Sequence, residues 1–330
     1  MLNLTELYQK KVSSIDKVET FRLQQQMMLE QGQRWFLLPA LLIAVGLSLF
    51  FLGKGPIAAL VCGLSLIVFF LIGALKILPA YTRFNDQFKR KVLYALLEDL
   101  YPSVYYAPDN YVPSSLFSKA QLYPVGGNYT GEDYVEGETN HGATFKFSAL
   151  TVQATLADDH ALQQIFQGLF LVIDVHLKSN YPIYILPTNT DMEGIDLTQF
   201  IQQPLEDFIS SDQVNSYVEH PEFGKKFTVY TLDKEVTTVL LKEPLIEVIY
   251  KWYSQWGCET HLSWIGQQLF IALPSATIFP TADLTQKVED NTALHYFYDQ
   301  LLYGLSLVEF FGRINTPKSN IGNDSTFKKK

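Results

Sequence analysis

Two long uncharged stretches separated by three residues constrain this chain more than any other feature of its sequence. Residues 35–52 are 18 residues without a charge, and residues 56–75 are another 20. At a rise of 1.5 Å per residue, helices of these lengths span about 27 to 30 Å, which matches the hydrocarbon core of a bilayer. Neither stretch has the polar stripe of a helix in a soluble core. The sequence therefore predicts a transmembrane helical hairpin over residues 35–78.

The connection and the flanks of this hairpin predict its orientation. Because Gly53-Lys54-Gly55 is so short, the two helices must be antiparallel neighbours. Cytoplasmic flanks of membrane helices are enriched in Lys and Arg. Both flanks are basic and the connection carries one lysine, so we expect both termini to be cytoplasmic; the flanking cations are Lys17, Arg22, Arg34, Lys76, Arg83, Lys89, Arg90 and Lys91. Small residues should let the helices pack closely, namely Gly46, Ser48, Gly63, Ser65 and Gly73.

Helical periodicity continues on both sides of the hairpin. In the N-terminal segment 1–34, apolar residues recur every three or four positions, which predicts an amphipathic helix. Its apolar stripe could contact the bilayer surface, another subunit or the same chain, and we favour packing within the chain. Residues 79–100 predict a juxtamembrane helix that Pro102 ends, with apolar spacing at Tyr81, Phe84, Phe88, Val92 and Leu96.

Residues 101–312 predict a soluble α+β domain with a mixed or antiparallel sheet and flanking helices. Segments rich in β-branched, aromatic and leucine residues predict strands at 144–156, 166–175, 181–186, 227–232, 236–241 and 261–273, the last with a turn at 265–268. Helices are expected at 244–255 and 291–312, too few to alternate with every strand. Residues 313–330 are polar and end in three lysines, which predicts a disordered tail.

The run from Phe166 to Val175 is expected to form the centre of the soluble core. It is nearly continuously apolar, which is typical of a strand covered on both faces. Gly168 should mark a bulge or a close backbone approach. The polar residues 176–180 predict a turn, so we expect the strands 166–175 and 181–186 to pair as an antiparallel hairpin.

The charge of the domain argues against nucleic acid and nucleotide partners. Residues 101–330 hold 14 Lys and Arg against 27 Asp and Glu, a net charge of −13, and no arginine lies between Arg90 and Arg313. Affinity for nucleic acid comes largely from cations that neutralise phosphates. Gly126, Gly127 and Gly131 have the spacing of a phosphate loop, but Glu132-Asp133 follows where a lysine and a hydroxyl are needed. We expect a tyrosine-rich turn there and no cofactor.

One segment concentrates side chains that could act as ligands or as acids and bases. The candidate polar site consists of Glu132, Asp133, Glu136 and His141. Their spacing fits neither a calcium-binding EF-hand loop nor a two-histidine zinc helix, and acidic residues between glycines usually form a solvated turn. We therefore expect no metal there. The six histidines are scattered, and no spacing indicates a catalytic residue.

Three segments resemble a bacterial family of membrane-anchored proteins known as domain of unknown function 3137. They are Gly131-Glu-Asp-Tyr-Val-Glu-Gly137, Phe166-Gln-Gly-Leu-Phe-Leu-Val-Ile-Asp174 and Glu222-Phe-Gly-Lys-Lys-Phe-Thr-Val-Tyr230, and Leu269-Phe-Ile-Ala-Leu273 is similar to a strand near the family's end. The resemblance implies a multi-pass protein of the bacterial inner membrane with a cytoplasmic α+β domain. It implies no reaction and assigns no catalytic residue.

Two functions from different classes fit these features. The first is a non-enzymatic, membrane-tethered binding or scaffolding module that contacts the lipid bilayer and either a protein partner or a second copy of itself. The second is an inner-leaflet enzyme of unknown class that uses the acidic cluster around 132–141. An acidic domain without arginine or a recognisable catalytic constellation favours the first.

Overall fold

The structure is a computed structural model that describes residues 12–100, 103–139, 141–155, 161–175, 177–188, 191–192, 195–196, 222–232, 241, 243–256, 259–274 and 281–314. The chain forms two compact units. The first comprises Met1–Asp99 and Pro280–Tyr298, and the second comprises Leu100–Phe279 and Asp299–Lys330. Residues 280–298, which lie far from the hairpin in the sequence, thus belong to the same unit as the hairpin.

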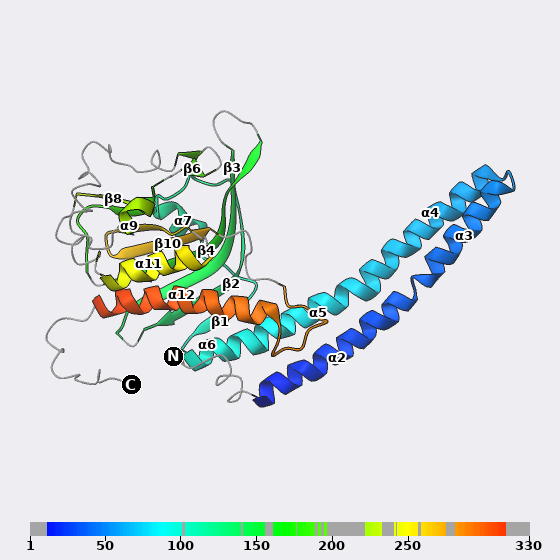
Figure 1. Ribbon diagram of the computed structural model, residues 1–330, viewed down its shortest axis with the longest axis horizontal. Helices are drawn as coiled ribbons and strands as arrows, with labels where there is room; N and C mark the ends of the chain where they lie inside the picture. The colour runs from blue at the N-terminus through cyan, green and yellow to red at the C-terminus, as the bar shows by residue number, and fades with distance from the viewer. Residues whose placement is uncertain are drawn as a thin grey trace. The chain divides into compact units, whose positions relative to one another are not determined.

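The apolar stretches form two helices, α3 (Leu37–Phe51) and α4 (Gly55–Ile72), which run side by side (Figure 1). Small residues line the seam between them: Gly46 and Ala58 are buried, and a Cβ added to Gly46 would lie 2.6 Å from Cys62 Sγ. The Ser65 hydroxyl donates a hydrogen bond of 2.8 Å to the Pro39 carbonyl. The close approach expected at Gly46 and Ser65 is therefore confirmed.

The remaining small residues of the hairpin do not belong to this seam. Ser48 and Gly63 are exposed, and a Cβ added to Gly63 or Gly73 would meet no atom within 4 Å. The prediction that all five small residues pack the two helices together was wrong for these three. Sequence shows which helix positions are small, but the rotation of each helix about its axis decides which of them face the partner.

The helices that flank the hairpin pack against each other. They are α2 (Val12–Arg34) before the hairpin, and after it α5 (Leu78–Phe88) and α6 (Tyr94–Leu100), with π-helical turns at Gly73–Ile77 and Lys89–Leu93. Val18 and Leu29 of α2 are buried, as are Phe84 and Phe88 of α5. The contact between α2 and α5 confirms the expected packing within the chain.

A loop from the far end of the sequence completes the first unit. Residues 281–291 follow the side of α2 and α5. Arg22 is only 4% exposed, and its Nη1 donates a hydrogen bond of 2.8 Å to the Leu284 carbonyl. Glu19 accepts a hydrogen bond of 3.1 Å from the Val288 N–H, and Asn85 accepts one of 3.3 Å from the Ala282 N–H. Polar side chains of the N-terminal helices thus satisfy backbone groups of this loop.

The second unit contains an eight-stranded antiparallel sheet in the order β1-β2-β3-β4-β10-β9-β5-β8. The strands are β1 (Tyr105–Ala107), β2 (Asn128–Glu138), β3 (Thr144–Thr155), β4 (Leu162–Asp174), β5 (Ile183–Pro187), β8 (Phe227–Thr231), β9 (His261–Ile265) and β10 (Gln268–Pro274). A separate pair is formed by β6 (Asp191–Met192) and β7 (Ile195–Asp196). The expected α+β class with an antiparallel sheet is confirmed.

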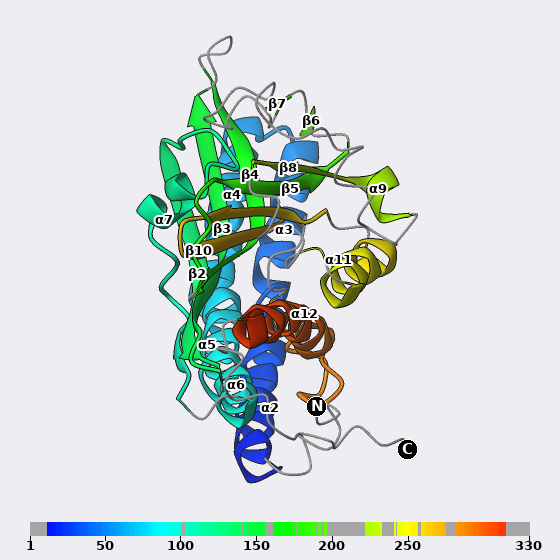
Figure 2. The same cartoon turned by 90° about the vertical axis from the view of Figure 1, so that its left-hand side faces the viewer.

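The helices cover both faces of this sheet. Figure 2 shows α7 (Ser114–Lys119) on one face and α11 (Glu243–Trp256) and α12 (Thr292–Ile314) on the other. On the α7 side, Phe117 packs against Phe170 with ring centroids 5.1 Å apart. On the α12 side, a Cβ added to Gly304 would lie 3.3 Å from Leu171. Strand β4 is therefore buried from both sides, as its continuous apolar run predicts.

Two expectations about the sheet were wrong. Strands β4 and β5 do not pair: β4 lies between β3 and β10, and β5 lies between β9 and β8. Of the segment 126–131 expected to be a tyrosine-rich turn, residues 128–131 belong to strand β2. The expected close approach at Gly168 is present, since a Cβ there would lie 2.0 Å from the Leu273 carbonyl oxygen on β10. The predicted strand 236–241 and the tail beyond residue 314 lie outside the described residues, apart from residue 241.

Candidate functional site

Asp133 is the most constrained of the four side chains predicted as a polar site. It is fully buried on β2, and the Tyr106 hydroxyl donates a hydrogen bond of 2.5 Å to its Oδ1. The register of β2 against β3 shifts between Glu132 and Val135, and the φ of Asp133 is +61°. Asp133 is buried while the neighbouring Glu132 is half-buried, as expected for successive strand residues that face opposite sides. We therefore interpret Asp133 as part of the bulge structure.

Glu136 and His141 have different surroundings from Asp133. Glu136 accepts a hydrogen bond of 2.9 Å from the Tyr134 hydroxyl and lies 3.3 Å from Lys146 Nζ. Burial, followed by this carboxylate, raises the pKa of Tyr134. The backbone N–H of His141 donates to Thr139 Oγ1 over 3.3 Å. Among the residues that the structure describes, no three His, Cys, Asp or Glu side chains are grouped closely enough to hold a metal ion.

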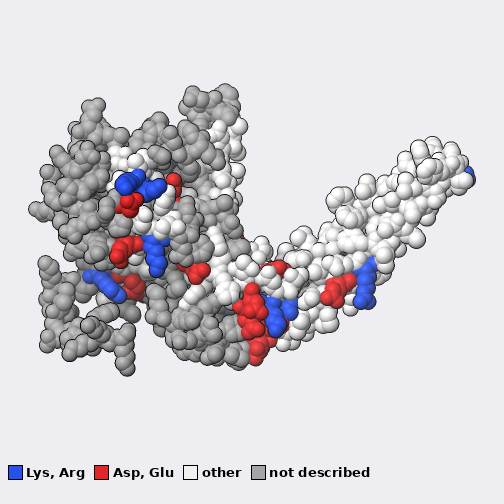
Figure 3. All heavy atoms as spheres, viewed as in Figure 1, with Lys and Arg blue, Asp and Glu red and all other residues white. Residues whose placement is uncertain are grey.

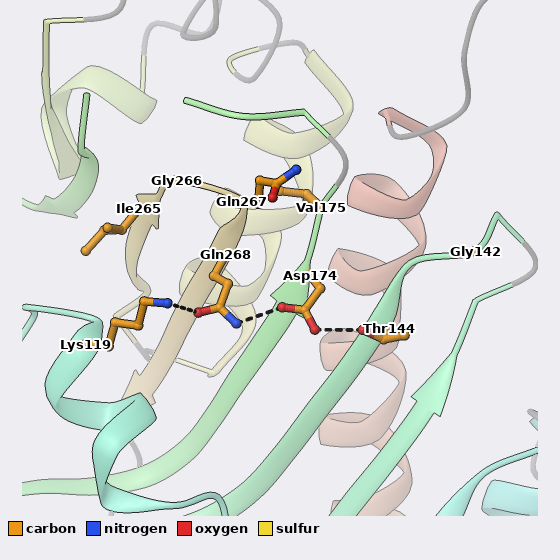
Figure 4. A pocket seen from close by; sticks show the side chains of 9 residues that line it. All are labelled: Lys119, Gly142, Thr144, Asp174, Val175, Ile265, Gly266, Gln267 and Gln268. Carbon is orange, nitrogen blue, oxygen red and sulfur yellow. Dashed lines mark hydrogen bonds between the residues drawn. The ribbon is translucent and has the colours of Figure 1, made fainter. Parts of the chain in front are cut away.

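A pocket of about 540 Å³ lies at one end of strands β3, β4 and β10, beside the end of α7 (Figure 4). Its lining combines polar side chains, two glycines and two apolar side chains: Lys119, Gly142, Thr144, Asp174, Val175, Ile265, Gly266, Gln267 and Gln268. Gly142 directly follows His141, but none of the four predicted side chains lines the pocket. A pocket of this volume is large enough for a small organic molecule.

A continuous row of hydrogen bonds crosses this pocket, as Figure 4 shows. Lys119 Nζ donates to Gln268 Oε1 over 2.6 Å, and Gln268 Nε2 donates to Asp174 Oδ1 over 2.8 Å. The Thr144 hydroxyl donates to the other carboxylate oxygen of Asp174 over 2.7 Å. The row thus holds an ammonium group and a carboxylate group on either side of one amide.

The register of the sheet explains this row. Gln268 and Asp174 are directly opposite on β10 and β4, and Phe145 pairs with Ile173, which places Thr144 beside Asp174. Opposite residues in an antiparallel pair point to the same face. Further along this face the same strands carry Val172 and other apolar residues that the chain around α7 covers. The pocket therefore forms where the apolar cover ends.

Few features of the sequence indicated this pocket. Its charged and amide side chains come from positions 119, 174, 267 and 268, which no short motif connects. The available signals were Asp174, which ends a long apolar run, and the amide pair Gln267-Gln268 beside the β9–β10 turn. Both features are common at strand ends, so only the pairing of the strands reveals that they meet.

A second polar group lies in the core beneath α7. His261 is 1% exposed, and its Nδ1 lies 2.5 Å from the hydroxyl of Tyr123. Its Nε2 lies 3.6 Å from Glu259 Oε2. Burial lowers the pKa of His261, although Glu259 opposes this effect, and burial raises the pKa of Tyr123. A neutral histidine hydrogen-bonded to a neutral tyrosine fits this buried position.

The fold and the pocket define an α+β protein with an apolar helical hairpin and a polar pocket on its sheet, and with no known catalytic arrangement among the residues described. Residues 164–313 match a family model described as "Protein of unknown function (DUF3137)". This match supports membership of the segment in that family, and it contains the resembling sequences at 166–174, 222–230 and 269–273.

A comparison with solved structures adds a distant similarity. The chain is similar to the crystal structure of the mycobacterial trehalose monomycolate transport factor A, TtfA, with 10% sequence identity and a TM-score of 0.33. This similarity covers 65% of the present chain and 89% of the other. No curated protein matches the chain.

Proposed function

We propose that this protein is a membrane-tethered binding or scaffolding module. In this proposal α3 and α4 cross the bilayer as a hairpin, both termini lie in the bacterial cytoplasm, and the sheet domain engages a protein partner or a second copy of the chain. One observation carries the proposal, namely the apolar outer surface of the hairpin.

This outer surface has the composition that lipid tails solvate. Leu37 is 75% exposed, Phe51 is 86% exposed and Leu60 is 70% exposed. The two helical stretches that hold the hairpin, Asp16–Phe51 and Gly55–Glu98, are long and apolar enough to cross a membrane, and only 11% and 17% of their most apolar windows are buried. Figure 3 shows this surface free of charged side chains up to the tip of the hairpin. Core helices of soluble proteins bury such surface, because its exposure to water costs about 25 cal/mol per Å².

The distribution of cations supports the proposed orientation. Lys54 is the only charged residue in the connection, whereas Arg34 and Lys76 lie at the two ends of the hairpin and further cations follow Lys76. Two of these cations count less than the sequence indicated, because Arg22 and Lys89 are buried, and Arg22 is hydrogen-bonded to Glu19 and to the Leu284 carbonyl. The excess of Lys and Arg on the terminal side remains without them.

Charge and geometry favour binding over catalysis. The domain is acidic, and the four candidate side chains do not form a site that a substrate could reach together: Asp133 is buried against Tyr106, and Glu136 is engaged with Tyr134 and Lys146. The second reading, an inner-leaflet enzyme acting through residues 132–141, therefore has no geometric support. An acidic surface favours a basic partner protein.

Reporter fusions test the orientation. Alkaline phosphatase, which is active only in the periplasm, should be inactive when fused after Lys330 and active when inserted after Lys54. Green fluorescent protein fused after Lys330 should fluoresce. The reversed pattern at Lys330 would overturn the proposed orientation.

Affinity purification in mild detergent tests the binding role. The full chain should retain a protein partner or a second, differently tagged copy at low salt, and the yield should fall as salt screens the acidic surface. Recovery of the tagged chain alone at every salt concentration would contradict a scaffolding function.

A further inference from the structure

A groove at the start of the hairpin carries an arginine at one end and apolar side chains along the rest. Its volume is about 470 Å³, and its lining consists of Arg34, Trp35, Leu37, Leu38 and Leu41. Positions 34, 37, 38 and 41 recur every three or four residues, so they lie on one face of a helical stretch. Seven residues of helix span about 10 Å. The groove therefore runs from a cation about that distance along the hairpin.

The packing of the opposite side explains why this face points outward. The chain turns at Trp35 and Phe36, between α2 and α3. Pro39 has no N–H to donate to the Trp35 carbonyl, which accepts a hydrogen bond of 3.1 Å from the Leu38 N–H instead. Pro39 is buried, and the ring centroids of Phe36 and Phe69 of α4 lie 4.9 Å apart. Because these residues pack on α4, the exposed leucines of the groove face away from it.

Arg34 has all its hydrogen-bond donors available for a ligand. Its side chain is exposed and forms no hydrogen bond or ion pair with any residue that the structure describes. A guanidinium group presents five N–H donors in a planar fork that matches a phosphate group. Arg34 is the last charge before 18 uncharged residues, so a bilayer-spanning α3 would place it at the level of the lipid headgroups. Tryptophan, as at position 35, is enriched at the same level.

We propose that this groove binds one phospholipid with an anionic headgroup, its phosphate on Arg34 and an acyl chain along Leu37, Leu38 and Leu41. The proposal rests on the membrane-spanning hairpin proposed above and names the class of lipid that it recognises. The lining has no carboxylate to receive the ammonium group of a zwitterionic headgroup, and Arg34 repels that cation. An anionic headgroup carries no such cation, so it is the better match.

A second copy of the hairpin fits this groove less well than a lipid does. Its apolar side chains could cover the leucines. However, the sequence has no Asp or Glu between Glu30 and Asp86, so a second hairpin offers no carboxylate to Arg34 at this depth. A phospholipid supplies both the anion and the apolar chain.

Quenching of Trp35 fluorescence by brominated lipids tests the proposal. Bromine atoms on an acyl chain quench a tryptophan that they contact, and comparison with Trp35→Phe isolates the emission of Trp35 from that of the other three tryptophans. The full chain is reconstituted into phosphatidylcholine vesicles that contain a small fraction of brominated phosphatidylglycerol or brominated phosphatidylcholine. We expect a relative binding constant at least about 5-fold higher for brominated phosphatidylglycerol. Equal quenching by the two lipids would overturn the proposal.

One substitution and a matched control distinguish a site from general surface charge. Arg34→Gln should reduce the preference to within about twofold of none, because Arg34 is the only charged residue in the lining. Lys76→Gln removes the same charge at the other end of the hairpin. Lys76 is also exposed and also without a hydrogen bond or ion pair to the described residues, but it lies outside the lining. It should keep the preference within about twofold of the original. Equal losses in the two variants would mean that lipids respond only to the total charge.

The same measurements separate this proposal from the membrane-tethering proposal. A hairpin in the bilayer brings Trp35 next to lipid whatever the headgroup, so equal quenching by both lipids would contradict the lipid site alone. Absence of quenching in a chain that resists extraction by alkaline carbonate would mean that protein covers the groove, which also contradicts the site alone. Absence of quenching in a chain that carbonate extracts would contradict both proposals. The comparison of the two lipids uses the unmodified chain, so it holds even if a variant fails to fold.

Discussion

At the scale of single residues, Phe170 shows how α7 packs on the sheet. It is fully buried on β4, between Phe117 of α7 and Phe270 of β10, with ring centroids 5.1 Å and 6.3 Å away. Its position was expected from the apolar run alone. Its partners were not, because they lie about 50 and 100 residues away in the sequence.

Replacing Phe170 with alanine should leave a cavity between α7 and the sheet. We expect Phe170→Ala to lower the free energy of unfolding by about 3 to 5 kcal/mol. Lys178→Ala, at an exposed position four residues after the end of β4, should cost less than about 0.5 kcal/mol. Denaturant titration of both variants in detergent micelles measures the difference. Equal, small losses would show that β4 is peripheral to the core.

His261 should make the stability depend on pH in a defined direction. Burial lowers its pKa in the folded state, whereas in the unfolded chain the pKa should be about 6.5. Below about pH 6.5 the unfolded chain therefore binds more protons than the folded chain, and stability is lost as the pH falls. The loss is at most about 1.4 kcal/mol per pH unit. Above about pH 6.5 both states hold a neutral His261, and the contribution of His261 to the free energy of unfolding is fully present.

The variant His261→Gln should remove this part of the pH dependence. Between pH 5 and 7, its free energy of unfolding should change less with pH than that of the original chain. His295→Gln, at an exposed position of α12, serves as the control and should keep the original slope. Identical slopes in all three proteins would mean that His261 does not titrate differently on folding.

At the scale of elements, α2 shows how a polar residue can specify packing. Its buried face contains Arg22 as well as Val18 and Leu29. Arg22 donates to Glu19, to Gln26 and to the Leu284 carbonyl. The sequence indicated an apolar stripe, and the arginine was assigned to the basic flank of the membrane. Only the loop 281–291, which supplies the carbonyl, explains why an arginine is buried here.

Two arginines provide a matched test of this contact. Arg22→Met should destabilise the first unit by about 1 to 3 kcal/mol, since it leaves the Leu284 carbonyl without its buried donor. Arg90→Met removes an ion pair with Asp86 in which both side chains are nearly half exposed, 47% and 46%, and should cost less than about 1 kcal/mol. Hydrogen exchange of α2 and of residues 281–291 reports the loss. Similar exchange in the two variants would contradict the role given to Arg22.

The hairpin offers a second matched pair at this scale. A side chain at Gly46 would enter the seam and collide with Cys62, whereas one at Gly63 would point into open space. Gly46→Leu should therefore separate α3 from α4 and lower the melting temperature in detergent, while Gly63→Leu should not. Cysteine cross-linking between the helices measures their separation. An equal effect of the two substitutions would mean that Gly46 does not lie in the seam.

At the scale of the whole molecule, the hairpin should decide where the protein is found. We expect the full chain to stay in the membrane pellet after an alkaline carbonate wash. A variant in which residues 37–72 are replaced by a flexible polar linker should move to the supernatant, because the exposed apolar surface is gone. Lys54→Ala should remain in the pellet as a control. A full chain released by carbonate would contradict the transmembrane proposal.

The sequence by itself determined the local structure of this protein: the two apolar helices, the helices at 243–256 and 292–314, and most strands of the sheet. Hydrophobic periodicity and breakers such as Pro102 act over a few residues, so they can be read without knowledge of the fold. Strand β2 was missed because its sequence holds two glycines and four acidic residues, a composition more typical of a turn than of a strand.

Only the tertiary structure decided which elements meet. Strands β9 and β10 lie between β4 and β5, so a pairing predicted from proximity in sequence failed. The same long-range pairing brings Lys119, Asp174 and Gln268 into one pocket, and packing of the loop 281–291 on α2 accounts for the buried Arg22. The physical reason is that strand pairing and burial depend on the free energy of contacts between distant segments, which local periodicity does not encode.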